Sequence, residues 1–156
     1  MSKRQKGFSL IELLIVVAII LIIAAIAIPN LLRSRMAANE ASAVGSLRTI
    51  NTAEVTYSTT YPSIGFAALA SLGGTAPCTS ATSTGACLLD DVLSAGVKSG
   101  YTFVTTAGAT VPAVTYVSNA SPSVAGQSGT RYFFSDQSGV IRYNGTTAAS
   151  ASDAAL

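Results

Sequence analysis

The chain has 156 residues, a formal net charge of +2, no histidine and 49% hydrophobic residues. Without histidine there is no Ser-His or Cys-His catalytic pair, so the sequence predicts no catalytic site, no cofactor and no enzyme activity. Three of the nine basic residues lie in the first seven positions, which leaves six bases against seven acids in the rest of the chain. Nucleic-acid-binding proteins usually have a clustered basic face, and this nearly neutral sequence does not predict one.

The first seven residues, MSKRQKG, form a basic leader. Lys3, Arg4 and Lys6 are expected to hold this end in the cytoplasm, because loops on the cytoplasmic side of a membrane carry an excess of Lys and Arg. Residues 1–7 are therefore read as a separate leader segment.

Residues 8–29 form an apolar stretch, and every side chain from Leu13 to Ile28 is apolar. At about 1.5 Å per residue, a helix of ~20 residues crosses the hydrocarbon core of a bilayer. A lipid-exposed segment of this kind is expected to be helical, because its backbone polar groups need internal hydrogen bonds. Glu12 lies inside this stretch, and an isolated carboxylate there costs about 2 to 4 kcal/mol, so Glu12 is a candidate functional residue that needs a partner.

Two simpler readings of this stretch remain open. Ala25-Ile26-Ala27 resembles the cleavage site of a secretory signal peptide. However, the apolar run here is longer than the apolar region of a signal peptide, which usually has about 7 to 15 residues. The stretch would also serve as a plain signal anchor, in which case Gly7-Phe8 and Glu12 carry no function.

The run Lys6-Gly7-Phe8-Ser9-Leu10-Ile11-Glu12-Leu13, the apolar helix and Pro29 together resemble the N-terminal segment of type IV prepilins and their pseudopilin relatives. The resemblance implies that a prepilin peptidase cuts after Gly7 and that the new amino group of Phe8 is methylated. It also implies that the apolar helix is kept in the mature protein. Glu12 would then neutralise the Phe8 amine of a neighbouring subunit and set the axial register during assembly. The alternative is that Glu12 only stabilises its own helix N-terminus, worth ~0.3 to 1 kcal/mol.

The helix is expected to continue through residues 30–61 and to end before Pro62. Pro29 removes an amide donor and should weaken the helix locally, a property that the resemblance also implies. Apolar residues recur at near-helical spacing on one face: Met36, Ala43, Leu47, Ile50, Tyr57 and Tyr61. Glu40 and Glu54 lie close to this face, where contacts with arginines of another subunit are conceivable. Arg33, Arg35 and Arg48 are expected on a solvated or subunit-pairing face, with weak contact to lipid or DNA as the alternative.

Residues 62–156 are predicted to form a globular part, which begins with a connecting region rich in Ala, Gly, Ser and Thr. Cys78 and Cys87 lie outside the cytoplasm in this topology and are expected to form a disulfide. A metal site is the poorer alternative, because two Cys and no His cannot complete a tetrahedral set. A short helix is predicted over Leu88 to Leu93. Asp90 and Asp91 are expected to be solvated, with a calcium site as a minor alternative.

From Tyr101 onward the apolar residues alternate as in half-buried strands. The pattern predicts about four antiparallel strands, with a hairpin turn at residues 136–139, and a loose C-terminal tail. The expected strands lie at 101–103, 114–116, 132–134 and 140–143. The helix stripe is available to cover the sheet, so the fold class is α+β: a long N-terminal α-helix packed on an antiparallel sheet, as in the pilin fold.

These features predict a structural subunit of a type IV pilus. The resemblance implies a precursor held in the bacterial inner membrane with its N-terminus in the cytoplasm, and an extracellular filament after assembly. Implied partners are further copies of the chain, the prepilin peptidase, and the assembly platform with its motor ATPases. Implied roles are adhesion, twitching motility or DNA uptake. The alternatives are a pseudopilin of a type II secretion system and a membrane-anchored binding module.

Overall fold

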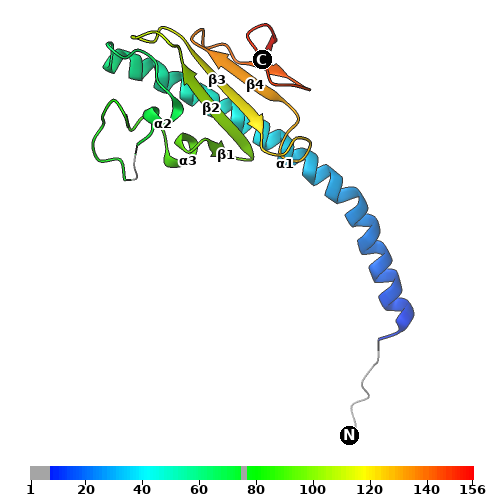
Figure 1. Ribbon diagram of the computed structural model, residues 1–156. Helices are drawn as coiled ribbons and strands as arrows, with labels where there is room; N and C mark the ends of the chain where they lie inside the picture. Colours follow the sequence, from blue (N-terminus) through cyan, green and yellow to red (C-terminus); the bar gives the residue numbers. More distant parts are fainter. Residues whose placement is uncertain (1–7, 75–76) are drawn as a thin grey trace. The chain divides into compact units, whose positions relative to one another are not determined.

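The computed structural model describes residues 8–74 and 77–156 (Figure 1). The leader, including Gly7, lies outside the described residues. The chain divides into two compact units, one ending at Arg35 and one from Met36 to Leu156. We call the second unit the head.

One helix, α1, runs from Leu10 to Thr60 and continues without a break through Pro29. The prediction that the helix continues beyond Pro29 is therefore confirmed. The helix ends where the sequence indicates, because Pro62 disfavours the helical conformation of Tyr61. The amide of Tyr61 still donates to the Tyr57 carbonyl at 2.8 Å, which closes the last turn.

Along the chain, two short helices follow α1 and precede the sheet. Helix α2 spans Leu69–Leu72 and was not expected from the sequence, whose apolar residues there are too few to show a period. Helix α3 spans Asp91–Ser94 and is shorter than predicted. It begins at its N-cap, Asp90, whose side chain accepts a hydrogen bond from the amide of Leu93 at 3.1 Å.

The sheet has six strands in the order β1-β2-β3-β4-β5-β6, and every neighbouring pair is antiparallel. It is thus a meander with six strands rather than the predicted four or so. The strands are β1 (Val97–Lys98), β2 (Tyr101–Ala107), β3 (Tyr116–Pro122), β4 (Tyr132–Asp136), β5 (Arg142–Asn144) and β6 (Ala154–Ala155). The two additional strands, β1 and β6, have two residues each, which is too short for an alternating pattern to be read.

Strand β3 lies later in the chain than predicted. Its register pairs Tyr116 with Ala107 and Pro122 with Tyr101, so it covers the whole of β2. The sequence signal at 114–116 was misleading because Val114 is exposed and precedes the paired residues. The inward-facing residues Ser118 and Ala120 are small and show no apolar alternation, although both are fully buried.

The head has its core between the second half of α1 and one face of the sheet (Figure 1). The predicted helix stripe is largely confirmed, because Ala43, Leu47, Ile50 and Tyr57 are buried while Tyr61 packs at the edge of the core. Strands β2, β3 and β4 contribute Tyr101, Phe103, Ala120 and Phe133, and Ile141 precedes β5. The chain between α1 and β1 contributes Leu69, Leu72, Leu89 and Leu93. The structure is therefore α+β, as predicted.

The C-terminal residues are ordered, and the expectation of a loose tail is wrong. The Asp153 carboxylate accepts hydrogen bonds from the Ser150 amide at 2.7 Å and from the Asn144 side chain at 2.9 Å. Arg142 donates to the Asp153 carbonyl at 2.9 Å. These polar contacts compensate for the small amount of apolar surface that the tail can bury.

Candidate functional site

The start of α1 carries the acidic residue that the sequence singles out. The Glu12 carboxylate accepts a hydrogen bond from the Ser9 amide at 3.0 Å, and the Ser9 carbonyl accepts from the Leu13 amide at 3.3 Å. Ser9 and Glu12 have the S-x-x-E spacing of a capping box, a signal that the sequence contains. In the single chain, Glu12 therefore caps its own helix. Its role in subunit register stays a prediction.

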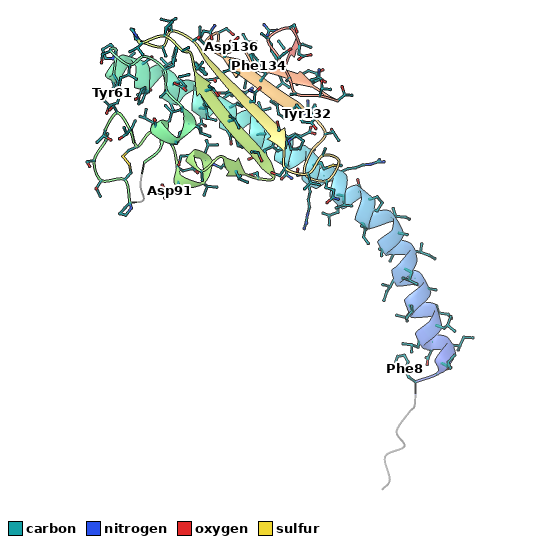
Figure 2. The ribbon with its side chains drawn as sticks, viewed as in Figure 1. Phe8, Tyr61, Asp91, Tyr132, Phe134 and Asp136 are labelled. Atoms are coloured by element: carbon teal, nitrogen blue, oxygen red, sulfur yellow. A yellow bond between two sulfur atoms is a disulfide. The ribbon has the colours of Figure 1, made fainter. Side chains whose placement is uncertain are left out.

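The first unit has an apolar surface with nothing from the described chain covering it. Phe8 is 82% exposed, and Figure 2 shows it at the beginning of the described chain. The exposed large apolar residues that follow are Leu10, Ile11, Leu13, Leu14, Ile15, Val16, Val17, Ile19, Ile20, Leu21, Ile22, Ile23, Ile26, Ile28, Leu31 and Leu32. Soluble monomers rarely expose a contiguous patch of this extent, so this surface requires lipid or another protein surface.

Helix α1 is long and apolar enough to cross a membrane, judged by length and composition. The most apolar part of the helix is unburied, which distinguishes it from the core helix of a soluble protein. Pro29 lies within the continuous helix, and its weakening effect stays a prediction.

The two acids of the helix stripe are buried in the head and are not available to arginines of another subunit. Glu40 is 7% exposed and Glu54 is 0% exposed. Arg33, Arg35 and Arg48 are exposed. The two ion pairs found in residues 8–74 and 77–156 include none of these three arginines.

Glu40 joins α1 to the loop before β4. Its carboxylate accepts hydrogen bonds from the Thr130 amide at 2.8 Å, the Thr130 hydroxyl at 3.0 Å and the Arg131 amide at 3.2 Å. It also forms an ion pair with the Arg131 guanidinium at 2.7 Å. Burial disfavours the charged carboxylate, but the hydrogen bonds from Thr130 and Arg131 outweigh it, so the pKa of Glu40 is lowered. This pairing across the fold could not be read from the sequence.

Arg131 also lies over two aromatic rings. Its guanidinium carbon is 5.5 Å from the ring centre of Phe133 and 5.6 Å from that of Tyr143. A planar cation favours the faces of aromatic rings at these distances. Glu40 thus connects α1 to both β4 and β5 through one arginine.

Glu54 lies one turn before Tyr57, beneath the chain that leaves α1. One carboxylate oxygen accepts a hydrogen bond from the Ala67 amide at 3.0 Å. Within the described residues, the other oxygen has no hydrogen-bond partner. Burial raises the pKa of Glu54 to about 7, although the Ala67 amide acts in the opposite direction.

Cys78 and Cys87 form a disulfide, as the sequence predicts. The loop that they close is attached to α1, because the Tyr57 hydroxyl donates to the Ser83 carbonyl at 2.5 Å. Its other end is attached to α2, since the Cys87 amide donates to the Gly73 carbonyl at 2.7 Å. The bridge therefore stabilises a local loop against the end of α1.

Asp90 is exposed, as expected, and it also has partners in the head. Besides capping α3, it forms an ion pair with Lys98 at 2.9 Å. The hydrogen bond from Lys98 is the main cause of its lowered pKa. Asp91 is exposed, as expected (Figure 2). The described ranges contain no group of three His, Cys, Asp or Glu residues that could hold a metal ion.

Comparison with known proteins gives one family match, in the N-terminal segment, and two curated relatives. Residues 2–28 match the model of the prokaryotic N-terminal methylation motif. The chain is 63% identical over 38 residues to the type IV wide pilus major component PilA4 of Thermus thermophilus, covering 24% of this chain and 29% of the relative. It is 45% identical over 56 residues to the type IV major pilin protein PilA of Myxococcus xanthus, covering 36% of this chain and 26% of that relative.

These matches confirm the resemblance to type IV pilins that the sequence indicated. The chain spans less than a third of the length of each of these curated relatives. No solved structure matches the chain significantly.

Proposed function

We propose that this chain, whose N-terminal segment is that of a type IV pilin, is a structural subunit of a type IV pilus filament. The observation that carries the proposal is the combination of the methylation motif with the exposed apolar surface of α1 in the first unit of the chain. Such a surface is stable in a bilayer before assembly and among identical helices afterwards. Both relatives named above are pilus subunits, which supports this reading.

The proposed maturation begins in the bacterial inner membrane with the leader in the cytoplasm. A prepilin peptidase cuts the peptide bond between Gly7 and Phe8 and the Phe8 amine is methylated. The assembly platform and its motor ATPases then move the subunit into an extracellular filament. Adhesion, twitching motility and DNA uptake are the proposed roles of the filament, and no reaction is assigned to the subunit itself.

Glu12 is proposed to pair with the Phe8 amine of a neighbouring copy. The hydrogen bond between Glu12 and the Ser9 amide places the carboxylate within one helical turn of the N-terminus. A buried charge that meets an opposite charge avoids part of the cost of leaving water, and it also fixes the register of the two chains. Pairing with a neighbour would replace or share the capping contact of the single chain.

Two other functions remain as alternatives. A pseudopilin of a type II secretion system has the same N-terminal features, and long extracellular fibres containing this chain would distinguish a pilin from it. In a membrane-anchored binding module the helix only tethers the head. Ligand capture by the chain, with no self-assembly of the full-length protein, would favour that function.

The Glu12 proposal is tested by two variants, Glu12→Ala and Glu12→Gln. The glutamine retains an oxygen that can accept from the Ser9 amide but lacks the negative charge. We expect both variants to enter the membrane and both to yield far fewer fibres than the parent chain. The readouts are the amount of chain in sheared fibres and the amount in the membrane fraction.

If Glu12 only caps its helix, Glu12→Gln would assemble normally while Glu12→Ala would be impaired. Normal assembly of both variants would remove any role for the residue. Either result contradicts the proposed pairing of Glu12 with the neighbouring amine.

A further inference from the structure

A buried carboxyl lies beneath the segment that connects α1 to the sheet. Glu54 is fully buried, and the one hydrogen bond that it makes among the described residues is to the backbone amide of Ala67. Neither ion pair found in residues 8–74 and 77–156 includes Glu54. A charged carboxylate in this position would lose its hydrating water and gain a hydrogen bond from one amide. That single bond compensates poorly for the free energy lost on leaving water.

Two phenols lie near enough to Glu54 for its charge to act on them. Tyr57 lies one turn further along α1, and Tyr116 lies on β3 with its hydroxyl donating to the Asn51 side chain. Burial raises the pKa of both phenols, that of Tyr116 to about 12, and Glu54 contributes to each shift. Both rings are therefore neutral near pH 7 and offer no positive charge to a carboxylate.

The connecting segment, residues 61–89, contains no Asp, Glu, Lys or Arg. The segment contacts α1 through the Ala67 amide on Glu54 and the Ser83 carbonyl on Tyr57. It contacts the chain before β3 through the amides of Phe66 and Ala113, which donate to the carbonyls of Ala113 and Ile64 respectively. The segment therefore has no carboxylate or amine of its own that could change its attachment to α1 with pH, and Tyr61, whose ring centre lies 4.9 Å from that of Tyr57, is its only tyrosine.

We infer that Glu54 is a pH-sensitive latch, whose neutral form holds the connecting segment against α1 and whose charged form loosens it. The neutral acid keeps the hydrogen bond from the Ala67 amide without placing an uncompensated charge in the core. When the proton leaves, the charged carboxylate is stabilised by contact with water. It reaches water when the segment lifts from α1. The structure of the sheet is not required to change.

The direction of the effect follows from linkage. The pKa of Glu54 is about 7 in the docked state, above its ordinary value of 4.5, so the docked state binds the proton more tightly than an opened state does. Docking of the connecting segment on α1 is strongest at pH values below the ordinary pKa of Glu54. It weakens as the pH rises through the pKa of the docked state. Between pH 5.5 and pH 8.5, the opening equilibrium is expected to shift by roughly tenfold or more toward the open state.

Hydrogen exchange of the full-length chain in detergent micelles tests the latch. Protection factors, corrected for the intrinsic pH dependence of exchange, are compared at pH 5.5 and pH 8.5 for residues 62–74 and for β2. We expect protection of residues 62–74 to fall by roughly tenfold or more at the higher pH, while β2 retains its protection. Glu54→Gln, which is neutral at both pH values, should abolish the difference.

Glu40→Gln serves as the matched control, because Glu40 is the other buried acid of α1 and is already paired with Arg131. This control should retain the pH effect on residues 62–74. Equal protection of the parent chain at both pH values would overturn the latch, as would an undiminished loss in Glu54→Gln. If Glu54→Gln does not fold, the carboxyl carbon of Glu54 in the parent chain is titrated by NMR, and a midpoint near its ordinary value overturns the inference.

Discussion

Removal of the Glu40 carboxylate is expected to destabilise the head strongly. In the structure this carboxylate accepts three hydrogen bonds from Thr130 and the Arg131 backbone, and it pairs with the Arg131 guanidinium. Glu40→Ala leaves the Thr130 amide and the arginine without these acceptors. Loss of a buried charged partner costs about 3 to 5 kcal/mol. Because the Arg131 side chain is 39% exposed and can reach water, we expect a loss of about 2 to 4 kcal/mol in the free energy of unfolding.

The measurement is denaturant-induced unfolding of the full-length chain in detergent micelles, followed by near-ultraviolet circular dichroism. Glu40→Gln is the matched variant, since its amide oxygen still accepts hydrogen bonds while the charge is lost, and it should be less destabilised than Glu40→Ala. Thr52, an exposed residue on α1, supplies a control in Thr52→Ala, which should change the free energy of unfolding little.

The contribution of Glu40 to the stability of the head is expected to fall on acidification. The pKa of Glu40 is lowered, so its contribution is present above the ordinary value of 4.5 and is lost as the pH falls through the lowered value. The parent chain should therefore lose more stability on acidification than Glu40→Gln does. A Glu40→Ala chain as stable as the parent, or equal acid sensitivity of Glu40→Gln and the parent, would refute this reasoning.

Three further predictions concern constraints on the backbone, at two glycines and at the disulfide. Gly65 has a φ of +82° and lies against Ala113, whose carbonyl a Cβ would overlap, so Gly65→Ala should destabilise the head by about 2 kcal/mol or more in thermal unfolding. Gly45→Ala, at a helical glycine with open space around it, should instead stabilise by about 0.5 to 1 kcal/mol, and a loss there would contradict the helix assignment. Replacement of Cys78 and Cys87 by serine should lower stability by about 2 to 3 kcal/mol in denaturant, as expected for a short closed loop. An unchanged denaturation midpoint would show that the bridge does not restrain the unfolded chain.

The long helix was predictable because its signals are local. The apolar run, the helical stripe and Pro62 together define a helix that the structure extends from Leu10 to Thr60. The hairpin turn at residues 136–139 was also predictable, and the Gly139 amide donates to the Asp136 carbonyl at 2.9 Å. Ser9 and Glu12 have the spacing of a capping box, a local signal for the helix start that the sequence contains.

What the sequence did not reveal depends on contacts between distant segments. Glu40 looked available for a neighbouring subunit, but it meets Arg131 at a separation of 91 residues. The register of β3 depends on pairing with β2, and its small buried residues carry no periodic signal. The ordered C-terminus is a different case, because it depends on polar contacts of Asp153 with Ser150 and Asn144, three and nine residues away, rather than on apolar burial. The Glu40 contact and the β3 register have no local pattern from which they could be read.

The most direct test of the account is intact-mass and N-terminal analysis of the chain in fibres sheared from cells that produce it. We predict an abundant fibre subunit that begins at Phe8, carries one methyl group on its amine and retains the whole apolar helix. A soluble monomer that begins downstream of Ala27 would contradict it, because the apolar surface would then have been removed rather than buried among copies of the chain.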